Sequence, residues 1–184
     1  MSYYIRRMCR EDVDQVTEID REAFPTMWPP ANYERELKVS LAHYITACVD
    51  GKVTERAGEQ KVVGFAGLWM MADEAHITNI AVRHSYQRQG IGEHLLIAMI
   101  NLAIEQDAHI LTLEVRASNT AAQKLYHKYG FTQIDIRRSY YTDNREDALV
   151  MTIGNIAGAV FQRQLRRLKK AHFRKWGVAL YHIV

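Results

Sequence analysis

The sequence contains little cysteine. Its 184 residues include two, Cys9 and Cys48, which are too few for a disulfide framework and do not form a CxxC pair. We therefore expect a reducing, cytoplasmic environment. The eight histidines are scattered and form no HExxH motif, so the pattern predicts no metal site.

Long apolar runs are also missing. No uninterrupted apolar stretch approaches the roughly 18 residues of a membrane-spanning helix. Residues 1–10 lack the apolar core of a signal peptide. We therefore expect no transmembrane segment and no secretory leader.

Apolar residues are nevertheless abundant, and basic charge is concentrated at one end. Hydrophobic residues make up 48% and aromatic residues 10% of the chain, which is ample for the core of one domain. Residues 154–184 carry seven Lys and Arg and no acidic residue, so the rest holds 17 basic against 21 acidic residues, a net charge of −4. We therefore divide the chain into a domain of residues 1–153 and a basic extension of residues 154–184, whose charge suggests an anionic partner.

Hydrophobic periodicity predicts an α/β (α+β) fold. Helical spacing occurs at residues 11–24, 32–39, 90–106, 120–129 and 155–176. Strand patterns occur at residues 3–7, 43–49, 61–71, 75–82, 111–116, 131–140 and 148–153. Residues 50–60 are predicted to form a hairpin loop, and Asp73 with Glu74 a tight turn. The order predicts a mixed central sheet of about seven strands flanked by about four helices, plus a C-terminal basic helix.

A glycine-containing segment lies between a predicted strand and a predicted helix. Residues 87–92 read Gln-Arg-Gln-Gly-Ile-Gly. Gly90 and Gly92 let backbone N–H groups point outward, and the helix N-terminus adds partial positive charge, which together are typical of a phosphate cradle. Arg88 can reach such an anion. The segment lacks the dinucleotide and P-loop patterns, and a turn glycine without a ligand is the alternative interpretation.

Three polar residues of the second half are candidates for chemistry. Glu114 is predicted on the polar face of a central strand, where a carboxylate must be paired or used because desolvation is costly. A salt bridge with Arg116 is the structural alternative. Asn119 is suited to capping the following helix, and Tyr126 to packing within it.

Five ordered segments together resemble the GNAT acetyltransferase superfamily, and within it the RimI type of ribosomal-protein-alanine N-acetyltransferases. They are residues 79–82, 86–92, 113–119, 125–131, and 137–141 together with 145–148. The resemblance extends over roughly residues 3–153. It implies acetyl transfer from acetyl-CoA to the α-amine of a protein N-terminus, with alanine on a small-subunit ribosomal protein as the expected acceptor.

The resemblance also implies roles for individual residues. Glu114 would act as general base through water, and Tyr126 as general acid toward the leaving thiolate. Acetyl-CoA would be held by Ile80, Ala81, Val82, Arg88, Gln89, Gly90, Ile91, Gly92, Glu93 and Asn119. Glu93 departs from the basic residue often seen at its position. The walls of the peptide groove would be Phe24, Pro25, Tyr140 and Tyr141.

The chemistry is coherent without the resemblance. An α-amine has a pKa of about 7.7–8.0, so at neutral pH a base must take a proton before the amine can attack a thioester. A backbone N–H near Val82 could stabilise the oxyanion. Direct attack needs no covalent enzyme intermediate, so neither cysteine is expected to take part.

Several alternatives remain open at this stage. The acceptor could be another N-terminus, a lysine side chain or a small amine, and a non-catalytic acyl-CoA-binding module is a rival from another class. The amphipathic tail could pack on its own domain, lie on a membrane surface or bind ribosomal RNA.

Overall fold

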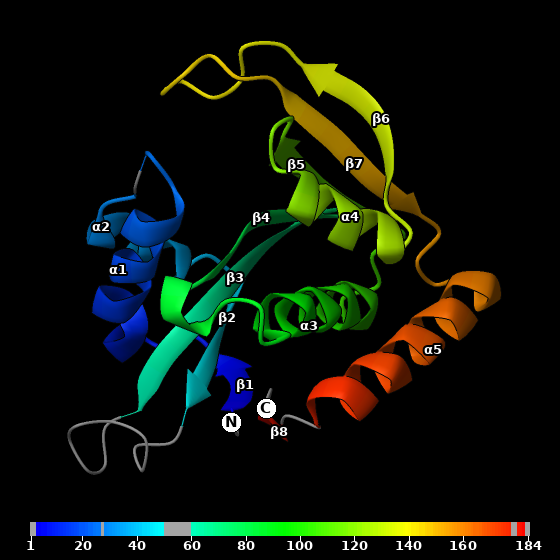
Figure 1. Cartoon of the computed structure of the whole chain (residues 1–184), viewed down its shortest axis with the longest axis horizontal. Coiled ribbons are helices and arrows are strands. Elements are labelled where there is room, and N and C mark those ends of the chain that lie inside the picture. Colours follow the sequence, from blue (N-terminus) through cyan, green and yellow to red (C-terminus); the bar gives the residue numbers. More distant parts are fainter. Residues whose placement is uncertain (1–2, 27, 50–59, 178–179, 183–184) are drawn as a thin grey trace.

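A computed structural model describes residues 3–26, 28–49, 60–177 and 180–182; the predicted loop at 50–60 lies almost wholly outside them. The described strands form one sheet in the order β6-β7-β5-β4-β3-β2-β1-β8 (Figure 1). The strands are β1 (Tyr3–Arg7), β2 (Ala42–Val49), β3 (Lys61–Met71), β4 (Glu74–Val82), β5 (Ile110–Arg116), β6 (Thr132–Arg137), β7 (Ala148–Gly154) and β8 (Leu180–His182). The sheet is mixed, because β4 pairs with β5 and β1 with β8 in parallel, whereas the other neighbours are antiparallel.

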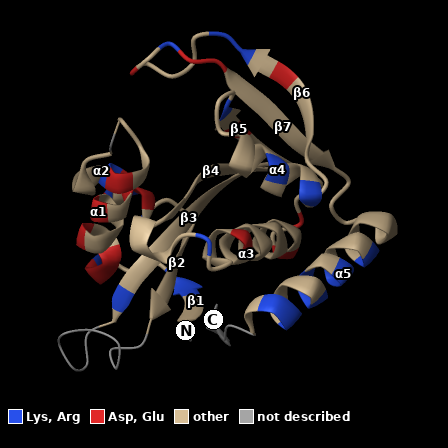
Figure 2. Ribbon diagram, viewed as in Figure 1, with Lys and Arg blue, Asp and Glu red and all other residues tan. Residues whose placement is uncertain are grey.

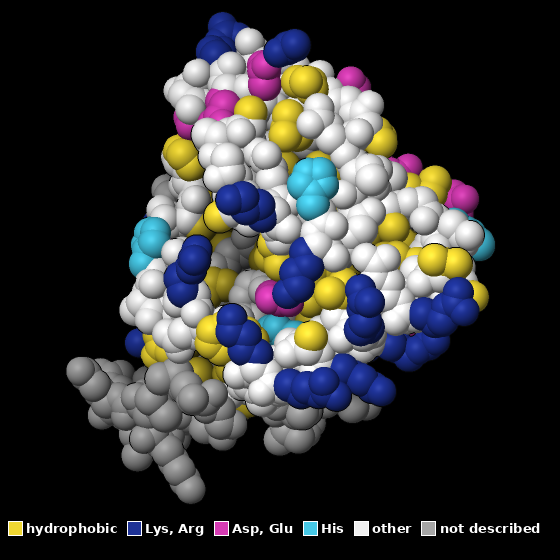
Figure 3. Space-filling view, turned by 45° about the vertical axis from the view of Figure 1, so that its right-hand side comes forward, with side chains coloured by type: hydrophobic (Ala, Val, Ile, Leu, Met, Phe, Trp, Pro, Cys, Tyr) yellow, Lys and Arg dark blue, Asp and Glu magenta, His cyan; other side chains and the backbone are white. Residues whose placement is uncertain are grey.

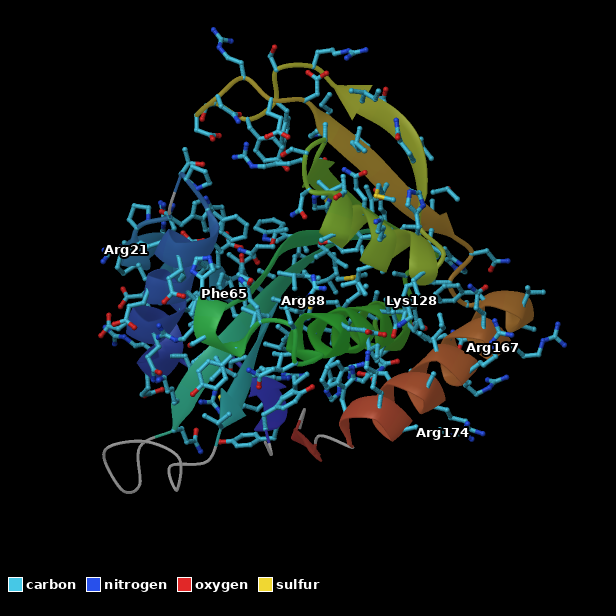
Figure 4. All side chains as sticks on the ribbon, viewed as in Figure 1. Arg21, Phe65, Arg88, Lys128, Arg167 and Arg174 are labelled. Carbon is cyan, nitrogen blue, oxygen red and sulfur yellow. The ribbon has the colours of Figure 1, made fainter. Side chains whose placement is uncertain are left out.

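Helices cover both faces of this sheet, which confirms the predicted α/β architecture. The helices are α1 (Val13–Ala23), α2 (Pro30–Glu36), α3 (Ile91–Glu105), α4 (Thr120–Lys128) and α5 (Ala159–Trp176), with short 3-10 helices η1 (Arg10–Asp12) and η2 (His84–Tyr86). The core is divided between two clusters. Ala66 packs with α3 on one side, and its neighbour Phe65, labelled in Figure 4, packs with α1 and α2 on the other.

Some element bounds differ from those predicted. The helix predicted at 32–39 runs from Pro30 to Glu36, because proline favours the first helical turn. The turn predicted at Asp73 and Glu74 lies at residues 72–73, where Ala72 adopts a positive φ of 56°. The strand predicted at 131–140 ends at Arg137, shortly before Ser139, whose φ of 48° is incompatible with an extended strand.

The centre of the sheet opens between β4 and β5. Their pairing ends at Ile77 and Leu113. A register shift opposite Gly67 leaves Thr78 as an extra residue in β4. Beyond this point β4 continues along β3 and β5 continues along β7, so the two parallel strands separate.

The basic extension returns to the body of the molecule. Leu165 of α5 joins the core cluster of α3, and Phe161 and Leu168 pack against it. After α5 the chain adds β8 to the edge of the sheet beside β1. Figure 2 shows that the charged residues of α5 are all basic, whereas α1 carries a concentration of acidic residues. Among the described helices, none combines the length and apolar character needed to cross a membrane.

Candidate active site

A cavity of about 420 Å³ lies where β4 and β5 separate. The two strands, α1 and α4 form its walls together with two loops, one after α1 and one around residues 140–142. Its lining residues are Asp20, Ala23, Phe24, Thr26, Trp28, Ile77, Thr78, Asn79, Ile80, Leu113, Glu114, Val115, Arg116, Asn119, Tyr126, Tyr140, Tyr141 and Thr142. The cavity therefore brings together the predicted catalytic pair and part of both predicted binding sets.

Glu114 is a largely buried carboxylate that lines this cavity. Its side chain is 8% exposed, with Oε2 2.8 Å from His76 Nε2 and Oε1 3.0 Å from an Arg137 guanidinium nitrogen. Burial by itself raises the pKa of Glu114, but the hydrogen bond and charge of His76, together with the charge of Arg137, outweigh it and hold the pKa below its usual value. The carboxylate is therefore ionised at neutral pH.

The alternative salt bridge between Glu114 and Arg116 does not form. Arg116 instead lies 2.7 Å from Asp143 and 3.1 Å from Glu146, and its guanidinium stacks 3.8 Å from the ring centroid of Tyr141. These contacts fix the loop between β6 and β7 against the end of β5. Glu114 is left facing the cavity with His76 and Arg137 as its partners.

Tyr126 reaches the same cavity from α4. Burial, with a smaller contribution from the charge of Tyr141, raises its pKa to about 12, so the phenol keeps its proton at neutral pH. Asn119 caps α4, because its side-chain oxygen accepts a hydrogen bond of 3.1 Å from the Ala122 N–H. The packing prediction for Tyr126 also holds in part, since its ring lies 5.7 Å from that of Phe131.

The predicted acetyl-CoA residues fall into two groups. Ile80 and Asn119 line the cavity, whereas Ala81 points into the core cluster beneath α1. The others lie beyond the cavity, at residue 82 and in the segment 88–93 that opens α3. That segment has left-handed backbone at Arg88 (φ 61°) and Gly90 (φ 82°), and Gly90 is the N-cap of α3 without a side-chain cap.

Glu93 faces away from the cavity toward two other helices. One carboxylate oxygen accepts hydrogen bonds of 2.6 Å from Lys128 Nζ and 2.7 Å from the Tyr129 hydroxyl. The other oxygen lies 3.6 Å from Nδ1 of the fully buried His172 of α5. Burial raises the pKa of Glu93, but these three groups outweigh it and lower the pKa to about 2.

Three of the four predicted peptide-wall residues line the cavity. Phe24, Tyr140 and Tyr141 line the cavity, and the two tyrosine rings meet edge to face at 5.3 Å. Pro25 is exposed and does not line it.

The structure adds residues that sequence reasoning missed. Asp20 is buried in the cavity wall, where it accepts hydrogen bonds from the Trp28 N–H (2.8 Å) and the Tyr33 hydroxyl (2.7 Å). It therefore fixes the loop after α1. His76 and Arg137 belong to other strands than Glu114, so no local motif could have paired them. In the part of the chain that the structure describes, no three His, Cys, Asp or Glu residues gather as metal ligands would.

Comparison with known proteins agrees with this fold. Residues 13–131 match the acetyltransferase (GNAT) family. A protein of Bacillus subtilis (strain 168), provisionally named a ribosomal protein bS18-alanine N-acetyltransferase, is 41% identical over 150 residues, covering 81% of this chain and 93% of that protein. The crystal structure of the ribosomal-protein-S18-alanine N-acetyltransferase from Escherichia coli superposes with a TM-score of 0.73 at 33% identity, covering 85% of this chain and 97% of that one. Arabidopsis thaliana NAA60 in complex with acetyl-CoA has a TM-score of 0.75, but at 17% identity this likeness shows the fold alone; it covers 85% of this chain and 100% of that one.

Proposed function

The chain belongs to the GNAT acetyltransferase family, and from that premise we propose that it transfers the acetyl group of acetyl-CoA to the N-terminal alanine of a small-subunit ribosomal protein. The observation that carries the proposal is that an ionised Glu114 and a protonated Tyr126 line the same cavity, where β4 and β5 separate. The printed names of the Bacillus and Escherichia relatives support this acceptor.

Acetyl-CoA would occupy the opening of the sheet. Beyond Ile77, the backbone of β4 loses its β5 neighbour, so the N–H and C=O groups at residues 80–82 are suitably placed for the amides of a pantetheine arm. The arm would lead to the start of α3, where the N–H groups of the first turn have no intrahelical partner. An added Cβ on Gly92 would meet only the Val82 side chain, at 3.6 Å, which leaves that side of the cradle open to a pyrophosphate.

Glu114 supplies the base for the acceptor amine. An α-ammonium group has a pKa of about 8 and must lose a proton before its nitrogen can attack the thioester carbonyl. The pKa of Glu114 is held low, so the carboxylate is charged at neutral pH and is a weak proton acceptor. It would draw the proton off through a water molecule, while His76 Nε2, 2.8 Å from Oε2, holds the carboxylate in place.

Tyr126 acts on the leaving group. Attack forms a new N–C bond and a tetrahedral oxyanion, which a backbone N–H near Val82 would stabilise. Collapse of this intermediate breaks the C–S bond, and the thiolate takes the phenolic proton of Tyr126. The proton removed from the amine leaves to solvent through Glu114, and Tyr126 is reprotonated from water.

The opposite end of the cavity is suited to a peptide. Tyr140 and Tyr141 close one side, and Phe24 with the loop that Asp20 holds closes the other. We infer that these aromatic walls receive an extended terminus with a small first side chain. We infer that residues 1–153 carry the reaction.

The extension offers a separate basic surface. Arg167 and Arg174 extend from α5 away from the sheet (Figure 4), and both are exposed. We infer that this face can meet an anionic surface such as ribosomal RNA, which is consistent with the proposed acceptor. Binding of an RNA fragment should then weaken steeply with added salt; salt-insensitive binding would count against it.

The proposal is tested by thiol release from acetyl-CoA with three peptides. We expect turnover with an alanine-led peptide that has a free terminus. We expect little with the same peptide blocked at its terminus, and little with a blocked peptide that carries an internal lysine. Preference for the lysine peptide would reassign the acceptor, and binding of acetyl-CoA without turnover of any amine would indicate a non-catalytic module.

A further inference from the structure

The end of α5 lies directly against the glycine segment that opens α3. A Cβ added to Gly90 would lie 2.7 Å from Cγ and Cδ1 of the Trp176 indole and 2.8 Å from Cδ2. Gly90 therefore permits the last residue of α5 to pack on the backbone of the candidate phosphate cradle. This contact joins the C-terminal extension to the proposed acetyl-CoA site.

The position of Trp176 is fixed from both sides. Upstream, Leu165 and His172 of α5 are buried against the body of the molecule, and Lys169 donates a hydrogen bond of 3.1 Å to Asn101 of α3. Downstream, β8 pairs with β1. A helix held at both ends presents its last side chain in one place, as expected for part of a binding site.

The indole forms a wall of the cradle and leaves its opening free. Trp176 covers the side of the cradle at Gly90. On the side at Gly92, an added Cβ would contact only the Val82 side chain, at 3.6 Å. The N–H groups of the first turn of α3 have no side-chain cap, because Gly90 is the N-cap. A phosphate group can therefore reach the helix start while a flat ligand lies beside the partly exposed indole.

Basic side chains surround the same region. Lys175 is exposed, and its Nζ lies 4.8 Å from the centroid of the Trp176 ring. Figure 3 shows that the face carrying α5 is hollowed, with Lys and Arg side chains around the hollow and one acidic side chain within it. Glu93, the acidic residue nearest the helix start, contacts Lys128 and His172, and the Lys128 ammonium offsets its negative charge. Lys175 and its neighbour Arg174 also offset the partial negative charge at the C-terminus of α5.

We propose that Trp176 and Lys175 contact the adenosine 3′-phosphate end of acetyl-CoA, so that the C-terminal extension completes the cosubstrate site. This inference rests on the proposed function. An aromatic ring beside an ammonium group matches a ligand that combines a purine with phosphates. The extension then contributes to the affinity for the whole coenzyme and contributes nothing to the affinity for its acyl-pantetheine half.

The test compares two acetyl donors on the full-length protein. Calorimetry gives the Kd of acetyl-CoA and of S-acetyl-4′-phosphopantetheine, which lacks the nucleotide. For Trp176→Ala we expect a Kd for acetyl-CoA about tenfold higher, because base stacking contributes about 1–3 kcal/mol. Lys175→Gln should raise the same Kd by a factor of about three. Neither variant should change the Kd of the shorter donor.

Matched variants separate contact from folding. Trp176→Phe keeps an aromatic ring and should recover much of the affinity, and Arg163→Gln, at the exposed start of α5, should leave the Kd at the wild-type value. An unchanged or lower Kd for Trp176→Ala would overturn the inference, the latter by showing that the indole obstructs the site. Equal weakening of both donors would overturn it as well. Failure of the wild type to bind acetyl-CoA would instead overturn the proposed function, and this inference with it.

Discussion

Glu93 should be the residue that ties α4 and α5 to the start of α3. Its carboxylate meets Lys128 and Tyr129 at the end of α4 and the buried His172 of α5. Glu93→Gln keeps the shape of the side chain and removes its charge. We expect the variant to be less stable at neutral pH, since the contacts with Lys128 and His172 depend on that charge.

The magnitude follows from the pKa of Glu93, which is lowered from 4.5 to about 2. A shift of that size corresponds to about 3 kcal/mol, and solvent screening of the half-exposed Lys128 reduces it to about 2 kcal/mol. A lowered carboxyl pKa stabilises the fold above the unfolded value and loses this effect as pH falls through the folded value. The loss in free energy of unfolding that Glu93→Gln causes relative to wild type should therefore shrink to about 1 kcal/mol at pH 3 and nearly vanish at pH 2.

Urea unfolding of wild type and Glu93→Gln at pH 7, 5 and 3 measures this difference. Glu105→Gln removes an exposed carboxylate from the other end of the same helix and should change stability by a few tenths of a kcal/mol at most. Equal stability of Glu93→Gln and wild type at pH 7 would refute the reasoning. So would a deficit that stays constant down to pH 3.

Three further predictions concern the cavity. Glu114→Gln should lower kcat by at least about a hundredfold with little change in the Kd of acetyl-CoA, and a kcat within a few-fold of wild type would remove Glu114 as the base. Tyr126→Phe should lower kcat by about tenfold or more in the same steady-state assay, and unchanged turnover would remove the phenol from the mechanism. Asp20→Ala removes the hydrogen-bond acceptor of the Trp28 N–H and the Tyr33 hydroxyl. The KM for peptide should therefore rise several-fold while the KM for acetyl-CoA stays constant. Equal rises in both KM values would contradict the role of Asp20 in holding the loop after α1.

Much of the fold was predictable because the signals are local. The alternation around Glu114 and the N-cap at Asn119 both depend on a few neighbouring residues. The glycine segment at 87–92 was recognisable for the same reason. Roles carried over from the family resemblance remain proposals.

The contacts that the sequence did not reveal cross between distant segments. His76 meets Glu114 only because β4 and β5 pair in parallel, with His76 opposite Thr112. Arg116 was a reasonable partner for Glu114 by spacing on one strand, but the loop after β6 brings two carboxylates to it instead. An eighth strand from the extension was not predicted either, because three residues carry too little pattern to identify a strand.

The location of the acetyl group in the product tests the central claim most directly. Full-length protein, acetyl-CoA and an alanine-led peptide with an internal lysine are incubated together, and tandem mass spectrometry locates the added acetyl group. We expect it on the α-amine, with product falling in parallel when Glu114 and Tyr126 are replaced. Acetyl on the lysine side chain, or undiminished product from the doubly substituted protein, would contradict the account.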